Sequence, residues 1–463
     1  MPISSPGFNP RVFREYDIRG VADRDFGDAF VRDLGRAIGT LLGRRGQRRL
    51  ALGRDCRISS PRIHAAFVDG LLATGAEILD VGVVPTPLLY YAPFHFHLDG
   101  GIQITGSHNP APDNGFKIVS GRTTIHGEDI QALKRIIADR DYLDGRGSHE
   151  SRDVLDAYVD EARRRVSLGP RRPRVVVDAG NGAGGPAALA LYRRLGFDVV
   201  PLFCDMDGRF PNHHPDPTVP ENLEALHAEV ARQGAELGLA FDGDADRIGA
   251  VDARGRVVWG DQLMLIFARA ILTEHPGATF VSEVKCSQSL FDEIARAGGR
   301  AIMWKAGHSL IKAKMRETGA LLAGEMSGHI FFAHRWLGFD DAVYAGARLL
   351  ELLSRGERTL AEIVDELPRA VNTPELRVEV ADEHKFEVVA RAAAALRRRP
   401  DVLEVIEVDG ARVRFEGGWG LVRASNTQAA LVMRFEAEDE VRLAHLRAEV
   451  EAVIAEVRAE VGA

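Results

Sequence analysis

Four short segments, far apart in the chain, carry side chains that could do chemistry on a charged substrate. The first, Thr105-Gly106-Ser107-His108-Asn109-Pro110, follows the apolar run Gly101-Ile102-Gln103-Ile104, which indicates the end of a strand. Gly106 allows a close backbone approach to a ligand, and Asn109-Pro110 breaks regular structure. Because loops at strand ends often carry function, Ser107 is a candidate reactive hydroxyl.

The second segment, Asp242-Gly243-Asp244-Ala245-Asp246-Arg247, spaces three carboxylates at i, i+2 and i+4. In an extended segment they would share one side, where their charges repel unless a cation lies among them. Oxygen ligands indicate a hard metal, and three of them leave room for a phosphate oxygen, which suits Mg²⁺. An EF-hand calcium loop does not fit, because its sixth and twelfth positions hold Arg247 and Ala253 instead of Gly and Glu.

The third segment is Gly324-Glu325-Met326-Ser327-Gly328-His329. The same alternation would place Glu325, Ser327 and His329 on one face. A carboxylate, a hydroxyl and an imidazole together could hold a polyhydroxylated ring, and the imidazole could move a proton. Taken alone, this segment is better explained by a structural histidine in a glycine-bounded turn.

The fourth segment, Arg423-Ala424-Ser425-Asn426-Thr427, follows a predicted turn at Gly417-Gly418-Trp419-Gly420. Guanidinium, hydroxyl and backbone amide groups at a turn make a phosphate nest, although Ser-Asn-Thr clusters are also ordinary turn formers. Two accessory segments, Tyr16-Asp17-Ile18-Arg19-Gly20 and Gly115-Phe116-Lys117, could add the cations of Arg19 and Lys117.

A glycine-rich segment offers a competing interpretation. Gly180-Asn181-Gly182-Ala183-Gly184-Gly185 lies between a predicted strand and a predicted helix and matches G-x-G-x-x-G, with Asp205 about twenty residues beyond. This pattern is typical of dinucleotide binding, but such a site leaves Ser107 and the three aspartates unexplained. Tight packing of a strand-to-helix turn is therefore the favoured interpretation.

Composition sets the broad class. The chain has 463 residues with 45% hydrophobic and 27% charged residues, which predicts a soluble protein of about three or four domains. A net charge of −8 with dispersed basic residues argues against nucleic acid as the main partner. The three separated cysteines form no disulfide or zinc pattern. Because no signal peptide or membrane-spanning run is evident, we expect no membrane association and a cytoplasmic location.

Alternating strand and helix patterns must position these segments. Leu50–Gly53, Pro61–Thr74 and Glu77–Val83 form a βαβ pattern that recurs from Arg174 to Phe203 and from Gln262 to Trp304. Beyond about Pro374, strand-like alternation over four runs and two helical segments indicate an antiparallel α+β module. We predict three tandem mixed α/β domains plus a C-terminal α+β domain around a central cleft, with boundaries at 1–152, 153–255, 256–369 and 370–463.

Together the four segments resemble the α-D-phosphohexomutase superfamily, and within it the bacterial phosphomannomutase/phosphoglucomutase family, in the family's order and over essentially the whole chain. By this resemblance, the segments are the phosphoserine, magnesium, sugar and phosphate loops, in that order. The methionine at position 326 is similar to the residue in mannose/glucose-type members, whereas phosphoglucosamine mutases usually carry Gln at this position. Gln428-Ala429 departs from relatives that often have a proline close behind Thr427.

The resemblance implies phosphoryl transfer between hexose 1-phosphate and hexose 6-phosphate, through a phosphoserine and a hexose 1,6-bisphosphate that also serves as activator. It implies catalytic roles for Ser107, Lys117, Arg19, Arg247, His108 and His329. It implies Mg²⁺ held by Ser107, Asp242, Asp244 and Asp246. It implies phosphosugar binding by Tyr16, Lys285, His308, Glu325, Ser327, His329, Arg423, Ser425, Asn426 and Thr427.

Other functions remain open on the sequence. A phosphoglucosamine mutase and a sugar-phosphate phosphatase would use the same serine and metal, a dehydrogenase would use the glycine-rich turn, and a sugar-phosphate sensor would bind without turnover. The preferred hexose and the choice between monomer and homodimer are not determined by these motifs.

Overall fold

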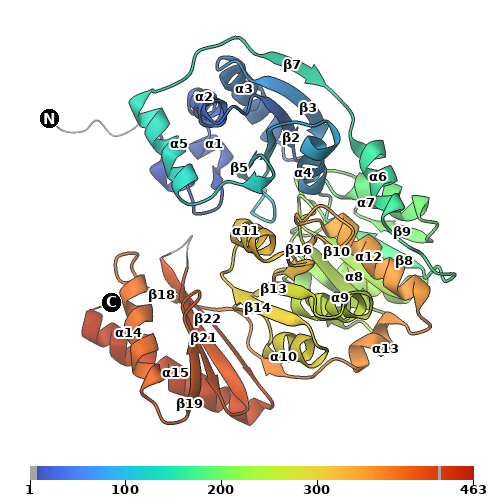
Figure 1. The fold of residues 1–463 in the computed structure, drawn as a ribbon, viewed down its shortest axis with the longest axis vertical. Helices are drawn as coiled ribbons and strands as arrows, with labels where there is room; N and C mark the ends of the chain where they lie inside the picture. The colour runs from blue at the N-terminus through green and yellow to red at the C-terminus, as the bar shows by residue number, and fades with distance from the viewer. Residues whose placement is uncertain (1–7, 426–428, 463) are drawn as a thin grey trace.

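The protein is described here by a computed structural model that covers residues 8–425 and 429–462. Its strands form four separate sheets in chain order, three of them mixed and the last one antiparallel. The predicted fold class is therefore confirmed, while the domain boundaries remain predictions. Figure 1 shows the four units following one another in an arc, which brings the N-terminal and C-terminal units to the two sides of a gap.

The N-terminal domain has a sheet in the order β1-β5-β4-β2-β3-β7, with β6 beside β5. Strands β2, β3, β4 and β7 run parallel, and β5 is antiparallel to β4. The predicted strand Glu77–Val83 coincides with β3. The elements are η1 Pro10–Val12, β1 Ile18–Val21, α1 Ala22–Asp25, α2 Asp28–Arg44, β2 Arg49–Arg54, α3 Ser60–Leu72, β3 Glu77–Val83, α4 Thr86–His95, β4 Gly100–Ile104, β5 Asp113–Ser120, β6 Thr123–Thr124, α5 Glu128–Asp139 and β7 Ser148–Ser151.

The second domain is built on the order β12-β11-β10-β8-β9, in which β8, β9 and β10 are parallel and β11 is antiparallel to β10. All residues of β8, β10 and β11 are buried, as expected for a sheet covered on both faces. The elements are α6 Leu155–Arg164, β8 Val175–Asp178, α7 Gly185–Arg194, β9 Val199–Leu202, η2 Pro220–Leu223, α8 Glu224–Gln233, β10 Leu237–Phe241, β11 Ile248–Asp252 and β12 Val257–Val258.

The third domain has the sheet order β14-β13-β15-β16, again with an antiparallel strand, β16, beside a parallel one, β15. Its helix α12 is capped by the Asp341 carboxylate, which accepts a hydrogen bond from the amide of Tyr344. The elements are α9 Gly260–Glu274, β13 Thr279–Glu283, α10 Gln288–Arg296, β14 Arg300–Trp304, α11 His308–Thr318, β15 Leu322–Gly324, β16 Ile330–Phe332, α12 Ala342–Arg355 and α13 Leu360–Asp365.

The fourth domain is an antiparallel sheet, β17-β22-β21-β20-β19 with β18 beside β22, covered by α14 and α15. The predicted turn at Gly417–Gly420 is wrong over most of its length, because strand β21 already begins at Gly418. Gly418 and Gly420 occupy strand positions where a Cβ would press on Leu446 and on the ring of Phe435. The elements are β17 Val371–Asn372, β18 Leu376–Glu379, α14 Lys385–Arg397, β19 Val402–Ile406, β20 Ala411–Phe415, β21 Gly418–Ala424, β22 Ala430–Ala437 and α15 Glu440–Val461.

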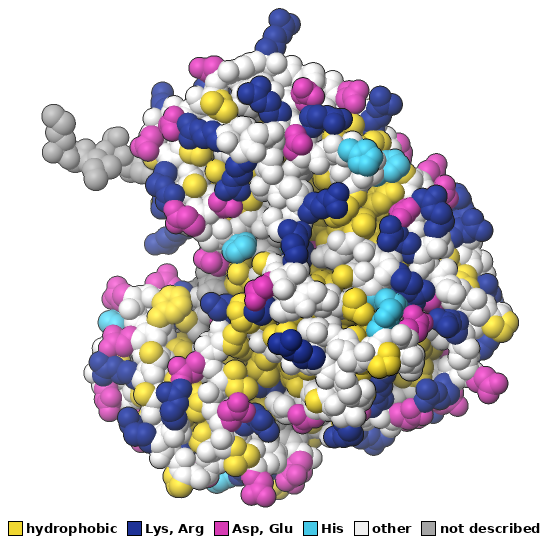
Figure 2. Space-filling view, viewed as in Figure 1, with side chains coloured by type: hydrophobic (Ala, Val, Ile, Leu, Met, Phe, Trp, Pro, Cys, Tyr) yellow, Lys and Arg dark blue, Asp and Glu magenta, His cyan; other side chains and the backbone are white. Residues whose placement is uncertain are grey.

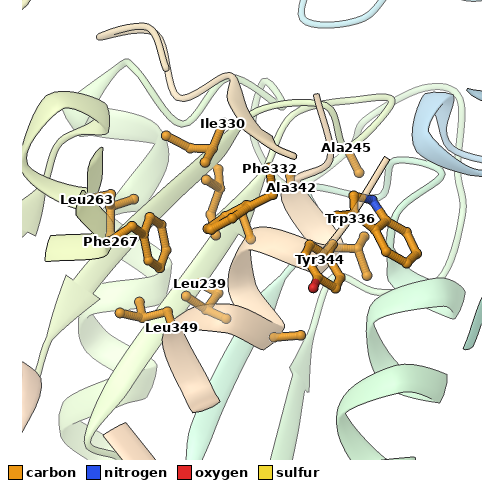
Figure 3. Packing of buried hydrophobic residues seen from close by; sticks show 14 of the residues in the cluster. Leu239, Ala245, Leu263, Phe267, Ile330, Phe332, Trp336, Ala342, Tyr344 and Leu349 are labelled. Carbon is orange, nitrogen blue, oxygen red and sulfur yellow. The ribbon is translucent and has the colours of Figure 1, made fainter. Parts of the chain in front are cut away.

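Some of the domains share a hydrophobic core, and some also have a core of their own. The second and third domains share one hydrophobic cluster, and Figure 3 shows Leu239 of β10 in the same packed group as Phe267 of α9 and Tyr344 of α12. The N-terminal domain adds residues such as Leu79 and Leu88 to this cluster and has another cluster of its own, and the C-terminal domain has a separate cluster. Among the described residues, no helix is long and apolar enough to cross a membrane.

The same structural position carries the predicted functional segment in every domain. Each segment joins two neighbouring strands that pair antiparallel: β4 to β5, β10 to β11, β15 to β16, and β21 to β22. A reversal of direction between adjacent strands exposes the connecting backbone at the sheet edge, where function is usually located. The arc of domains then turns these four edges toward one another.

Candidate active site

The predicted segments meet in a cleft of about 1090 Å³, which opens between the N-terminal and C-terminal domains in Figure 2. Its walls carry more Lys and Arg side chains than carboxylates, in contrast to the net charge of −8. Such a local excess of cations suits an anionic ligand. The predicted residues on its wall are Tyr16, Arg19, His108, Lys117, Arg247, Lys285, His308, Glu325, Ser327, His329, Arg423 and Ser425.

Buried side chains hold the backbone of the loop that carries Ser107 in place. Ser107 has a φ of +49°, a strained backbone conformation typical of functional positions. The buried guanidinium of Arg57 donates to the carbonyl oxygens of Ser107, at 2.7 Å, and Asn109, at 2.6 Å, while Asp55 accepts from the amide of Gly106 at 3.0 Å. A Cβ at Gly106 would collide with Arg57. The glycine is therefore required by packing.

The Ser107 hydroxyl lies directly beside the acidic loop. Its Oγ donates to Asp242 Oδ2 at 2.7 Å and lies 3.2 Å from His108 Nδ1. Burial and the nearby cations Arg247 and Arg19 hold the pKa of His108 well below its usual value, so this imidazole is neutral at neutral pH.

The three aspartates converge, but not through an extended strand. Oxygens of Asp242, Asp244 and Asp246 lie within 4.8 Å of one another. The predicted extended conformation is wrong: the chain turns here, the amide of Ala245 donates to the carbonyl of Asp242 at 3.0 Å, and Ala245 has a φ of +54°. A turn wraps the carboxylates around a point, whereas a strand would space them along a line.

The acidic loop, residues 242–247, has carboxylate oxygens that are available to bind a cation. All three aspartates are fully buried, and Asp244 Oδ1 and Asp246 Oδ1 have no hydrogen-bond partner among the described residues. Burial and the neighbouring Asp244 and Asp246 raise the pKa of Asp242 well above its usual value. Buried, unpaired carboxylate oxygens fit a hard divalent ion.

Lys117 partly balances this charge. Its Nζ donates to Asp244 Oδ2 at 2.7 Å and also contacts Asp246. Burial opposes the ammonium charge, but the two aspartates outweigh burial and raise the pKa of Lys117. The lysine is therefore a fixed positive charge beneath the Ser107 loop, and Thr86 supplies a further hydrogen bond to Asp244 at 2.5 Å.

The glycine-rich segment at 180–185 packs closely against the acidic loop. The amide of Ala183 donates to the carbonyl of Gly243 at 3.0 Å. A Cβ at Gly182 would lie 2.7 Å from that carbonyl, and one at Gly184 would lie 2.5 Å from Ala245 Cβ. These glycines let the acidic loop rest on the start of α7, which confirms the favoured interpretation of the motif.

The third segment also turns instead of alternating, so its predicted extended conformation is wrong. Ser327 Oγ lies 3.4 Å from Glu325 Oε2, and His329 Nε2 lies 4.0 Å from the same carboxylate. Gly328, with a φ of +91°, lets this turn contact Ile248, whose amide donates to the carbonyl of Gly328 at 3.0 Å. The second and third functional loops are therefore joined through their backbones.

His329 has a defined orientation. Its Nε2 accepts from Arg247 Nε at 3.0 Å, which leaves the proton on Nδ1, 3.3 Å from Asp340 Oδ2. Asp340 also accepts from Lys312 at 2.8 Å and lies 3.7 Å from the ring of His308. Two cleft histidines thus share one buried carboxylate.

The remaining predicted residues approach from other sides. Arg19 pairs with Asp17 at 2.5 Å and donates to Asn109 of the Ser107 loop at 2.9 Å. Lys285 lies 3.4 Å from Glu375 of the C-terminal domain. Arg423 lies within strand β21, and Ser425 follows it. Asn426 and Thr427 lie outside the described residues.

Sequence reasoning missed several buried residues that hold the site: Asp55, Arg57, Thr86, Glu283 and Asp340. Their signal in the sequence was weak, because each lies at or near the end of an ordinary strand or helix without a motif of its own. A charged residue buried in a loop can be recognised only when its partners are known.

Comparisons with known proteins agree with this geometry. Four phosphoglucomutase/phosphomannomutase family models match in order: alpha/beta/alpha domain I at residues 10–144, domain II at 156–255, domain III at 259–371 and the C-terminal domain at 375–453.

The chain is 45% identical over 449 residues to a phosphomannomutase/phosphoglucomutase of Pseudomonas aeruginosa, covering 96% of this chain and 95% of the relative. It is 44% identical over 446 residues to a phosphoglucomutase of Neisseria gonorrhoeae, covering 96% of each. A crystal structure of a phosphoglucomutase/phosphomannomutase family protein from Burkholderia thailandensis superposes with a TM-score of 0.92 at 42% identity, covering 97% and 98% of the two chains. The chain therefore belongs to the phosphoglucomutase/phosphomannomutase family of the α-D-phosphohexomutase superfamily.

Proposed function

We propose that this protein is a phosphomannomutase/phosphoglucomutase, which interconverts hexose 1-phosphate and hexose 6-phosphate through a phosphoserine and a hexose 1,6-bisphosphate. The observation that carries the proposal is the 2.7 Å hydrogen bond from Ser107 Oγ to Asp242 Oδ2. It joins a strained, buried hydroxyl to a buried acidic loop at the base of a cationic cleft. Two relatives that are 46% and 45% identical over nearly the whole chain carry both activities in their names, and a third, at 44%, is named phosphoglucomutase.

Phosphoryl transfer depends on positioning and on stabilising negative charge. Asp242, Asp244 and Asp246, with the oxygen on Ser107, would hold Mg²⁺, which when bound draws charge away from the transferring phosphoryl group. Lys117 Nζ lies 2.7 Å from Asp244 Oδ2 and adds a positive charge there. Arg19 and Arg247 add fixed positive charge at the cleft wall.

Phosphoryl transfer, proton transfer and substrate binding would each be carried out by different side chains. Ser107 Oγ gives its phosphoryl group to a free sugar hydroxyl and later takes one back from the other end of the bisphosphate. His329 and Lys117 are the candidates for proton transfer. His329 carries a lone pair on Nε2, which faces Arg247, and would receive the hydroxyl proton, whereas the protonated Lys117 would donate one. Glu325 and Ser327 would hold the ring hydroxyls, and Arg423 and Ser425 would hold the non-reacting phosphate.

We expect the enzyme to act on small phosphosugars in the cytoplasm, as a monomer or homodimer. Met326, which lines the cleft, favours mannose or glucose substrates over glucosamine.

Ser107→Ala should lower kcat for glucose 1-phosphate by at least about 10³-fold, because a covalent phosphoryl carrier is lost. A coupled glucose 6-phosphate assay with catalytic glucose 1,6-bisphosphate measures the rate. Ser59→Ala is a matched control, because Ser59 lies outside the cleft at the start of α3. Release of inorganic phosphate by the unmodified enzyme at a rate similar to isomerisation would favour the phosphatase alternative, and near-full activity of the Ser107 variant would exclude the assignment of the nucleophile.

A further inference from the structure

The loop between β14 and α11, residues 305–307, lies where three parts of the cleft meet. Tyr16 of the N-terminal domain donates from its hydroxyl to the carbonyl of Ala306 at 3.0 Å. Asp409 of the C-terminal domain accepts from the amide of Ala306 at 3.0 Å. The amide of Gly307 donates to Glu325 Oε1 at 2.6 Å. Residues 305–307 are thus hydrogen-bonded to both the N-terminal and the C-terminal domain. They also hydrogen-bond to the carboxylate of Glu325 in the third functional segment.

The contacts on this loop are closely linked. The carbonyl of Ala306 and the amide of Gly307 belong to the same planar peptide unit, so Tyr16 and Glu325 hold its two ends. The amide of Ala306, which Asp409 holds, belongs to the preceding peptide unit. A rotation of either unit would weaken more than one of these hydrogen bonds.

Asp409 has a second partner, Arg423. The Asp409 carboxylate lies 3.0 Å from Arg423 Nη2, and the exposed fractions of the two side chains are 15% and 9%. Burial disfavours the guanidinium charge, but Asp409 opposes that effect and the pKa of Arg423 is raised. Arg423 Nε has no hydrogen-bond partner among the described residues. Asp409 therefore fixes the side chain while leaving a donor for an anion.

Two glycines make these approaches possible. Gly410, with a φ of +83°, follows Asp409, and a Cβ there would lie 2.6 Å from Arg423 Cβ. Gly307, with a φ of +131°, faces the ring of Tyr16, where a Cβ would lie 2.8 Å from the ring. Both positions need positive φ and close contact, which glycine alone combines without strain.

We propose that Asp409 is a positioning residue that couples the phosphate-binding Arg423 to the sugar-binding Glu325 through the backbone of Ala306 and Gly307. The proposal rests on the proposed function, since it assigns Arg423 and Glu325 to the two ends of one phosphosugar. Where this contact between the domains is made, as in this structure, the link sets the distance between the ring contacts and the distal phosphate contact. The substrate class it selects is a hexose monophosphate of fixed length, held at both ends at once.

The test compares Asp409→Ala and Asp409→Asn with the unmodified enzyme. Asp401→Ala is the matched control, because Asp401 also pairs with an arginine of the C-terminal domain, Arg399, which does not line the cleft as Arg423 does. Three quantities are measured: amide hydrogen exchange of the peptide that contains Ala306, the Kd of glucose 6-phosphate by calorimetry, and the steady-state constants for glucose 1-phosphate.

We expect Asp409→Ala to raise exchange at Ala306, and to raise both the Kd and the KM about tenfold, as for loss of a hydrogen-bonded charged partner. The kcat should change by less than about threefold, because the lost contact is made equally in ground and transition states. Asp409→Asn, which keeps an acceptor, should show a smaller effect. A merely destabilised domain would lower kcat through loss of active enzyme and leave KM unchanged.

Unchanged Kd or unchanged exchange at Ala306 in a folded Asp409→Ala protein would overturn the proposal. If Asp409→Ala does not fold, the same criteria apply to Asp409→Asn. Failure of the proposed function gives a different result, in which the unmodified enzyme does not interconvert hexose phosphates while Ala306 exchange still responds to Asp409.

Discussion

Charge balance around Asp242, Asp244 and Asp246 decides what the base of the cleft can bind. The three buried carboxylates face one lysine, Lys117, so a further positive charge would relieve their repulsion. Some side chains around the three aspartates would bind the ligand directly, whereas others hold a neighbouring side chain in place. Substitutions separate these two roles.

Asp244→Asn should raise the Kd for a divalent cation by at least about tenfold, since removing a charged ligand costs more than disturbing an outer contact. Titration with Mn²⁺, followed by electron paramagnetic resonance, measures this affinity. An unchanged Kd would contradict the assignment of Asp244 as a ligand.

Glu274→Gln is the control for that experiment, because Glu274, His275 and His334 form another group with ligand atoms within 4.8 Å of one another, away from the three aspartates. Here His334 Nδ1 accepts from Arg348 at 3.0 Å, so the neutral ring carries its proton on the nitrogen that faces Glu274. Burial lowers the pKa of His334 to about 4. With both ring nitrogens engaged, this group is a poor metal site, and Glu274→Gln should leave Mn²⁺ affinity unchanged.

Asp25 supports the strand that carries Arg19, and its contribution depends on pH. Hydrogen bonding from Arg24 lowers the pKa of Asp25 to about 2, with further hydrogen bonds from Asn9 and the amide of Val21. A depressed carboxyl pKa gives stability that is present above the unfolded value of 3.8 and lost as the pH falls to about 2.

Asp25→Asn should therefore lower the free energy of unfolding by about 1–2 kcal/mol at pH 7, a value reduced for the exposure of Arg24. The difference from the unmodified protein should shrink between pH 4 and pH 2. Urea unfolding at several pH values measures it, and a difference that does not vary over this range would contradict the explanation.

At the scale of elements, the site depends on how closely loops from different domains approach one another. Gly243 illustrates this, because a Cβ there would collide with the carbonyl oxygen of Ser107. The acidic loop thus reaches the Ser107 loop only because one residue lacks a side chain.

Gly243→Ala should displace the two loops by a few tenths of an ångström or more and lower kcat by about 10²-fold, since small misplacements of reacting groups are costly. Coupled isomerisation rates, with circular dichroism to monitor folding, measure the effect. Gly27→Ala is the matched control, because a Cβ at position 27 meets nothing within 4 Å. Equal activity of the two variants would show that this approach is not limiting.

At the scale of the whole molecule, the domains are joined by different kinds of interface. The first three domains contribute to one hydrophobic cluster. The C-terminal domain contacts the third through a small cluster of Val284, Trp419 and Leu421 and through the buried Arg412. Its guanidinium donates to the carbonyl of Cys286 at 2.7 Å and lies 3.7 Å above the ring of Trp419. We expect the C-terminal domain to be the part whose position changes when ligand enters and leaves.

Arg412→Ala should uncouple this domain, because it leaves buried carbonyl groups without a donor and costs about 3 kcal/mol at the interface. Differential scanning calorimetry should then show a separate transition at lower temperature. Arg414→Ala, in the same strand but with a more exposed side chain paired to Glu404, should leave the profile unchanged. A single unshifted transition for Arg412→Ala would contradict the interface assignment.

The sequence by itself determined the fold class, the order of the domains and twelve of the residues that line the cleft. Strand Glu77–Val83 has the predicted bounds, because hydrophobic periodicity is a local property. Ser107 and the three aspartates could be selected because their residue types and spacing restrict the chemistry they can perform.

Only the tertiary structure decided how these residues meet. The turns at 242–246 and 325–329 replaced the predicted extended segments, and the strand beginning at Gly418 replaced a predicted turn. Arg57, Asp340 and Asp409 carry no local motif, since a buried charge is stabilised by partners that lie far along the chain. Local sequence thus specifies which groups can react, and long-range packing specifies their distances.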